Sequence, residues 1–129
     1  MIIVRVEVLN ALVFERPSGV PNTAAALTTM YQTVFTSGRG ARSGVPHIAI
    51  VVTSGLSTSI SATAAAAEAA RRSGVDIYAV AYTSGGRPDM EEIRRIANTN
   101  GGTYVLTLGD STGTPPSVAN TLLDRLCQA

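Results

Sequence analysis

The sequence predicts an α/β fold: a doubly wound, mostly parallel sheet with helices on both faces, in a single domain over residues 1–129. Two observations lead to this prediction. From residue 22 onward, helix-like stretches alternate with short runs of apolar and β-branched residues, which is typical of strand-helix-strand units. Each connection between two such runs is long enough to contain a helix, as parallel neighbours require. A length of 129 residues suffices for one hydrophobic core.

The N-terminal stretch fits two interpretations. Val4, Val6 and Val8 alternate with charged residues, as in a half-exposed strand, whereas the apolar positions of residues 8–13 fit a helical turn. We favour a strand over residues 2–8, followed by a short helix or turn.

The first clear helix is predicted to begin at Asn22 or Thr23, because both side chains can accept a hydrogen bond from the first helical turn. Apolar side chains recur at helical spacing from Leu27 to Phe35. Gly38 lies beyond the last turn and is expected to end the helix.

Three strands are predicted after this helix. Residues 48–52 and 75–83 are nearly continuous apolar runs, as expected for parallel strands that are covered on both faces. Residues 103–108 form the third predicted strand. Between the first two strands, the Ala-rich residues 61–73 are predicted to be helical, and Gly74 is the expected stop.

Two further helices are predicted in the C-terminal part. Pro88 suits a first helical position, and Asp89, Glu91 and Glu92 then lie at the positive end of the helix dipole. The last helix is predicted to begin at Pro115. It is expected to turn five residues inward, namely Val118, Ala119, Leu122, Leu123 and Leu126.

The composition argues against several classes of protein. The chain has 10 basic and 9 acidic residues and a formal net charge of +1, which argues against a basic nucleic-acid-binding surface or a polybasic membrane-binding patch. No run approaches the ~20 apolar residues of a transmembrane helix. A single cysteine cannot form an internal disulfide. Cys127 is therefore either a buried small apolar group or half of a bridge to a residue outside the chain.

Ligands of open parallel sheets bind beyond the carboxyl ends of the strands. The loops expected there, residues 53–59, 83–87 and 109–114, are rich in Ser, Thr and Gly. Ser54 lies at a strand-to-helix turn, but its flanks are not G-x-S-x-G. The only histidine, His47, is expected at the opposite end of the sheet. These residues therefore predict no catalytic centre.

The acidic residues do not predict a metal site either. Only Asp110 is expected to face the ligand side of the sheet, and one carboxylate among hydroxyl groups would hold a divalent cation poorly. A small α/β hydrolase or nucleotide binder built on Ser54, Ser57 and Asp110 is the less favoured alternative, since no base, phosphate loop or metal cluster accompanies these residues.

Several stretches resemble the von Willebrand factor type A (VWA) family, as found in matrilins, type VI collagen and integrin α-subunits. Residues 21–27, PNTAAAL, are similar to its T-N-T-G/A-x-A-L helix start. Residues 40–55, GARSGVPHIAIVVTSG, resemble its G-A-R-x-G-V-P-K-V-x-V-V-x-T-D-G. Residues 73–81, SGVDIYAVA, are similar to its A-G-V-x-V-x-A-I-G strand, and residues 122–127, LLDRLC, to its closing helix and Cys. The resemblance spans residues 8–127.

The resemblance implies a divalent-cation site, from which this sequence departs. Members of the family bind the ion through a D-x-S-x-S loop after their first strand, a Thr at the helix start and the Asp of T-D-G. Here Pro21 stands at the Thr position and Ser54 at the Asp position, and D-x-S-x-S has no counterpart. Because a hard cation needs charged oxygen ligands, the metal-ion-dependent adhesion site is expected to be degenerate and to hold no metal.

The absent motif predicts that the chain lacks the family's first strand and is an incomplete domain of a longer multidomain protein. In the family that strand lies beside the one formed here by residues 48–52. Its loss would leave an apolar edge unpaired, unless residues 2–8 move into the vacancy. Cys127 stands where the family often closes its domain with a disulfide, so its partner is expected outside this chain.

By resemblance, the expected function is that of a non-enzymatic adhesion module outside the cell, which binds a matrix or cell-surface protein and needs no cofactor. No nucleic acid or membrane span is expected. The alternative keeps the module and completes a Mg²⁺ or Ca²⁺ site with upstream sequence or with a carboxylate of the ligand. The expected ligand-binding face consists of Asn22, Thr23, Thr53, Ser54, Gly55, Ser57, Ser84 and Asp110.

Overall fold

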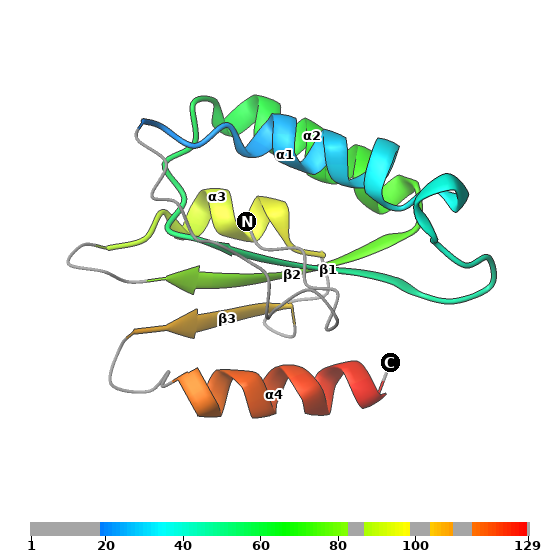
Figure 1. Ribbon diagram of the computed structural model, residues 1–129. Helices are drawn as coiled ribbons and strands as arrows, with labels where there is room; N and C mark the ends of the chain where they lie inside the picture. Colours follow the sequence, from blue (N-terminus) through cyan, green and yellow to red (C-terminus); the bar gives the residue numbers. More distant parts are fainter. Residues whose placement is uncertain (1–18, 83–86, 99–103, 110–114, 129) are drawn as a thin grey trace.

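A parallel sheet lies between two layers of helices (Figure 1). The computed structural model describes residues 19–82, 87–98, 104–109 and 115–128. The strands follow the order β1-β2-β3 and comprise β1 (His47–Thr53), β2 (Val75–Tyr82) and β3 (Val105–Leu108). One face carries α1 (Thr23–Thr29), α2 (Ile60–Arg72) and α3 (Met90–Ile96), and the other carries α4 (Pro115–Gln128). The predicted doubly wound α/β fold is confirmed.

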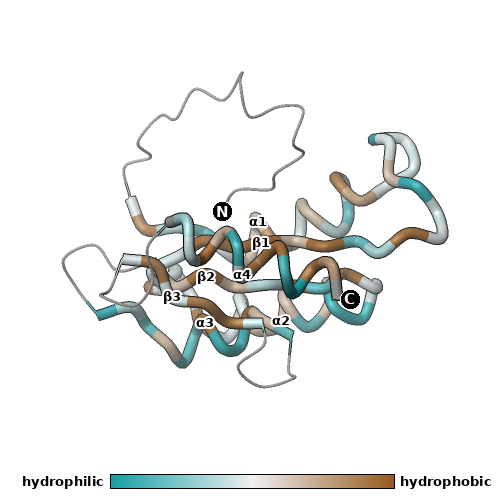
Figure 2. The backbone as a smooth tube through the Cα atoms, turned by 90° about the horizontal axis from the view of Figure 1, so that it is seen from below, coloured by the Kyte–Doolittle hydropathy of each residue, from teal (hydrophilic) through white to brown (hydrophobic). Residues whose placement is uncertain are grey.

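The strands are mostly apolar, as the brown segments of Figure 2 show, and helices lie over both faces of the sheet. The central strand β2 is almost fully buried, whereas most residues of β1 and β3 are half-buried. Along β1, alternate residues serve the two faces. Ala49 and Val51 belong to the cluster under α1 and α2, whereas Ile50 and Val52 pack against the cluster at α4. β2 continues both clusters, with Ile77 on the first face and Val80 on the second.

The first helix begins as predicted but ends differently. The side chain of Asn22 caps it by accepting a hydrogen bond from the N–H of Ala25 at 3.0 Å. After Thr29 the chain widens into a π-helical turn over Met30–Val34, in which the N–H of Phe35 donates to the carbonyl of Met30. Phe35 directly follows this wider turn. Its ring stacks on that of His47, with ring centroids 4.9 Å apart.

The start of α3 corrects the prediction for Pro88. The helix begins at Met90, and Asp89 is its N-cap, whose side chain accepts hydrogen bonds from the N–H groups of Glu91 and Glu92 at 3.1 Å. Pro88 therefore precedes the helix. The reason is that the side chain of Asp89 accepts hydrogen bonds from the first turn, whereas the side chain of Pro88 has no acceptor.

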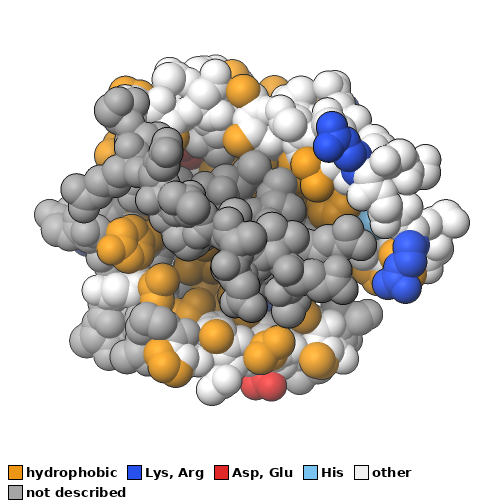
Figure 3. All heavy atoms as spheres, viewed as in Figure 1, with side chains coloured by type: hydrophobic (Ala, Val, Ile, Leu, Met, Phe, Trp, Pro, Cys, Tyr) orange, Lys and Arg blue, Asp and Glu red, His pale blue; other side chains and the backbone are white. Residues whose placement is uncertain are grey.

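The last helix, α4, also differs from its prediction in the residues that it buries. Val118 is buried and Leu122 packs against the same cluster, but Ala119 is exposed and the side chain of Leu123 is 58% exposed. Figure 3 shows apolar side chains at the surface around α4. Among the described residues, α4 is the helix on this face of the sheet, and it contacts the strands along one stripe that includes Val118 and Leu122.

The other elements lie close to their predicted bounds, apart from those outside the described residues. Ser59 caps α2, and Gly74 follows this helix with φ +91°. The third strand begins at Val105 rather than at residue 103, which is not described, and residues 2–8 also lie outside the described part. Within that part β1 pairs with β2 alone, and no helix is both long and apolar enough to span a membrane.

Candidate functional site

The carboxyl end of the sheet holds a groove of about 600 Å³ between the start of α1 and the end of β1. The N–H of Thr58 donates to the carbonyl of Pro21 at 3.1 Å and so ties the loop after β1 to the chain before α1. Four residues of the expected ligand-binding face line this groove, namely Asn22, Thr23, Thr53 and Ser54. The structure thus brings together two segments that the sequence placed in separate motifs.

The loop after β1 is held by short-range hydrogen bonds and by contact with α3. The hydroxyl of Thr53 accepts a hydrogen bond from the N–H of Gly55 at 3.0 Å. The carbonyl of Ser54 accepts one from the N–H of Asp89 at 2.9 Å. Gly55 has φ +78°, and a Cβ placed on it would lie 2.7 Å from the Cβ of Asp89. The close approach of the loop to α3 therefore requires glycine at this position.

Leu56 continues the unusual backbone of this loop. Its φ of +61° is left-handed, which is uncommon for a non-glycine residue, and its side chain is 64% exposed. The left-handed backbone costs stability at a non-glycine residue, and the exposed side chain gains little burial energy to offset that cost. The loop presents Leu56 to solvent beside the groove.

Glu92 lies in the first turn of α3, as the sequence predicts, but its burial was not predicted. The sequence predicts it at the positive end of a helix dipole, as a partner of that dipole, but its side chain is 0% exposed. One carboxyl oxygen accepts a hydrogen bond from the N–H of Ser57 at 3.1 Å, and the other has no hydrogen-bond partner among the described residues. One sequence feature indicates the burial of Glu92. It lies four residues before the buried Ile96 and therefore on the same face of the helix.

The other predicted site residues serve structural roles or lie outside the groove. Asn22 caps α1, and Thr23 is buried. Gly55 and Ser57 are not part of the groove lining, and the hydroxyl of Ser57 is hydrogen-bonded to that of Thr63 at 2.9 Å. Ser84 and Asp110 lie outside the described residues.

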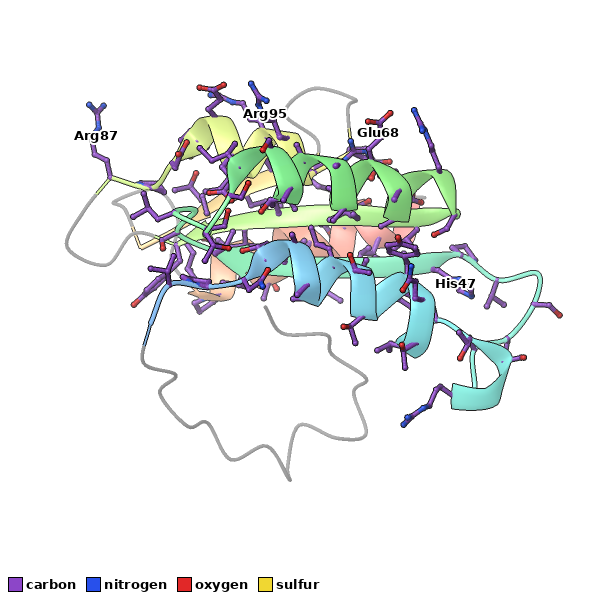
Figure 4. All side chains as sticks on the ribbon, turned by 90° about the horizontal axis from the view of Figure 1, so that it is seen from above. His47, Glu68, Arg87 and Arg95 are labelled. Carbon is purple, nitrogen blue, oxygen red and sulfur yellow. The ribbon has the colours of Figure 1, made fainter. Side chains whose placement is uncertain are left out.

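Cys127 and His47 lie away from this groove. Cys127 is a free, exposed cysteine on α4, so its interpretation as a buried apolar group is wrong. His47 begins β1, and Figure 4 shows it at the opposite end of the sheet from Arg87, as the sequence predicted. Neither residue can act together with Ser54.

The oxygen donors of the groove do not fit a divalent cation. Pro21 offers only a carbonyl, which already accepts a hydrogen bond from Thr58, and Ser54 offers a neutral hydroxyl. The described lining contains no carboxylate. Across the described residues, no three His, Cys, Asp or Glu side chains gather into a group that could hold a metal ion. Hard cations are bound by several oxygens that include carboxylates.

These features define a class: a doubly wound α/β domain with a hydroxyl-rich groove at the carboxyl ends of its strands. The model of the von Willebrand factor type A domain matches residues 6–120, and the chain belongs to this family. The resemblance seen in the sequence motifs is thereby confirmed at the level of the family. A search of curated protein sequences finds no match.

Solved structures with a similar fold include proximal thread matrix protein 1 from the mussel byssus. One structure of it, with a zinc-occupied MIDAS motif, has a TM-score of 0.76 and 21% identity and covers 92% of this chain. Another has a TM-score of 0.73, 22% identity and the same coverage. This chain spans 28% and 29% of the length of those two chains. At this identity the likeness concerns the fold.

Proposed function

We propose that this chain is a non-enzymatic, extracellular protein-binding module of the VWA type that contacts its partner without a metal ion. The observation that carries the proposal is the donor set of the groove, where Pro21 and Ser54 replace a hydroxyl and a carboxylate ligand of the family. Without the charged carboxylate and the hydroxyl, a cation gains too little to offset the loss of its hydration shell. The surface around this groove then has to bind the partner protein directly, through its own side chains.

Exposed apolar side chains around the groove favour a protein as the partner. Val20 and Tyr82 line the groove and are 64% and 44% exposed, and Leu56 projects from the neighbouring loop. Tyrosine is enriched among the residues that contribute most to binding at protein interfaces, and apolar neighbours such as Val20 and Leu56 can exclude water around it. A small polar ligand would leave them in water.

Three further observations support an extracellular location. The structures with a similar fold are of a thread matrix protein, and they support a place for this chain in an extracellular matrix. The exposed Cys127 is available for a disulfide to another part of a longer, multidomain protein, which only an oxidising compartment would preserve. The motifs shared with matrilins and type VI collagen favour the same setting.

A cation titration tests the proposal. We expect millimolar Mg²⁺, Mn²⁺, Ca²⁺ or Zn²⁺ to change the melting temperature by less than about 1 °C, because an ion at 100 times its Kd would stabilise the fold by about 2.7 kcal/mol and raise the melting temperature by several degrees. The measurement is differential scanning fluorimetry of the protein after chelator treatment. Ser54→Ala is the matched control variant, and each ion should likewise leave its melting temperature unchanged.

The alternative function is a VWA module whose cation site is completed by upstream sequence or by a carboxylate of the ligand. The hydroxyl groups of Thr53 and Ser54 in the groove are the observation in its favour. A melting shift with one cation that disappears in Ser54→Ala would replace the metal-free proposal with this one. The same titration of the chain with its native upstream sequence distinguishes the two sources of the missing ligands.

A further inference from the structure

A second groove lies on the outer surface of the helical layer, between α2 and α3. Its volume is about 540 Å³. Small residues of α2 line it, namely Ser61, Ala64 and Ala65, together with four charged residues, Glu68, Arg71, Arg94 and Arg95. Figure 4 shows that Glu68 and Arg95 extend from these two neighbouring helices. This arginine groove shares no residue with the groove at the carboxyl end of the sheet.

Arg71 forms the most constrained part of the arginine groove. Its Nη1 donates to the carbonyls of three residues at the end of α3, Arg95, Ile96 and Ala97, at 3.0, 2.9 and 3.2 Å. These hydrogen bonds join α2 to α3 and hold the guanidinium in place. Among the described residues, Nε and Nη2 of Arg71 have no hydrogen-bond partner. Partial burial lowers the pKa of Arg71 against the opposing effect of Glu68.

The charges around the arginine groove are unbalanced. Its two ion pairs, Arg72–Glu68 and Arg95–Glu91, lie within single helices and are exposed. Among the described residues, no carboxylate forms an ion pair with Arg71 or Arg94. The local surface therefore carries more positive than negative charge. Exposed ion pairs contribute little to stability, so Arg95 can exchange Glu91 for another carboxylate at small cost.

We propose that the arginine groove binds a short acidic segment of a partner protein. Carboxylates of that segment pair with Arg94, Arg95 and the available donors of Arg71, since the planar guanidinium matches a carboxylate in a two-bond geometry. A small or apolar side chain of the segment packs on Ala64 and Ala65. Because these two side chains are small, the backbone of the segment can approach α2 closely.

The composition of the arginine groove favours a protein over a sulfated polysaccharide. Glu68 stands in its wall, and Glu91 lies beside it on α3. Both carboxylates would repel a chain that is negatively charged at every unit, whereas a protein segment can place a neutral or basic residue opposite them. The side chains of Ala64 and Ala65 add apolar contact area that the sulfate and hydroxyl groups of a polysaccharide would not use.

Fluorescence anisotropy with a labelled peptide of Glu, Ala and Leu tests the proposal, with a peptide that carries Gln in place of Glu as the neutral probe. We expect the protein to bind the acidic peptide and not the neutral one. The double variant Arg94→Gln/Arg95→Gln should bind about tenfold more weakly, as the loss of about 1.4 kcal/mol implies. Arg87→Gln is the control, because Arg87 is exposed and does not line the groove.

Three results would overturn the proposal. The first is the absence of binding to the acidic peptide. The second is equal weakening by Arg87→Gln and by either single variant, Arg94→Gln or Arg95→Gln, since this would indicate a general charge effect. The third is tighter binding of a heparin fragment that the double variant abolishes, which would assign the groove to a polysaccharide. All variants change exposed side chains, and a thermal melt confirms that they are folded.

Discussion

Gly55→Ala is expected to destabilise the domain by about 2–5 kcal/mol, because two penalties add at this position. A left-handed backbone costs a non-glycine residue about 1–2 kcal/mol. The new methyl group would also lie 2.7 Å from the Cβ of Asp89, and an overlap of this kind typically costs a further ~1–3 kcal/mol. Urea unfolding followed by circular dichroism measures the loss.

Alanine substitutions at two other glycines allow the backbone penalty and the steric penalty to be measured separately. Gly74 has φ +91°, but a methyl group added to it would meet no neighbouring atom within 4 Å, so Gly74→Ala should cost only the backbone penalty of about 1–2 kcal/mol. Gly38 has neither feature, and Gly38→Ala should change the free energy of unfolding by less than about 0.5 kcal/mol. Equal losses for Gly55→Ala and Gly74→Ala would show that the loop after β1 does not pack against Asp89 as described.

Glu92→Ala is expected to destabilise the domain by about 2–4 kcal/mol. The substitution removes the acceptor of the Ser57 N–H and leaves a cavity at a fully buried position. The Ser57 N–H is partly buried, and a donor that loses its acceptor in such a place costs up to about 1–3 kcal/mol; the lost packing of the buried Glu92 side chain adds to this. Besides the free energy of unfolding, hydrogen exchange at the Ser57 amide should accelerate, because this amide is the group released.

The neighbouring Glu91 provides the control for Glu92. Its side chain is exposed and pairs with Arg95 at 2.6 Å, so Glu91→Ala should cost less than about 0.5 kcal/mol. Glu92→Gln retains an oxygen for the Ser57 N–H and should lose less stability than Glu92→Ala. If Glu92→Ala is as mild as Glu91→Ala, the carboxyl group does not anchor the loop after β1.

The strands were the most predictable elements of this fold. β1 and β2 begin and end within one residue of their predicted bounds, because their runs of apolar residues are continuous and stop at polar or glycine residues. Helix boundaries were less predictable. α3 begins at Met90 rather than at Pro88, since the competition between a proline start and an Asp cap depends on small free-energy differences.

The groove at the carboxyl end of the sheet was predictable in part. The strand order places Thr53 and Ser54 at that end, and the family motif adds Asn22 and Thr23, all of which line the groove. The burial of Glu92 was not predictable in the same way. It depends on the N–H of Ser57, which lies 35 residues earlier in the chain.

The sequence by itself determined the alternation of strands and helices and the family motifs, in which Pro21 and Ser54 stand at positions that the resemblance assigns to metal ligands. These properties follow from periodicity and residue type, which act locally along the chain. Only the tertiary structure decided that Glu92 anchors a loop, that Leu123 stays at the surface, and that arginines of two helices line one groove. Such features depend on the packing of segments that are distant in sequence, which local patterns do not encode.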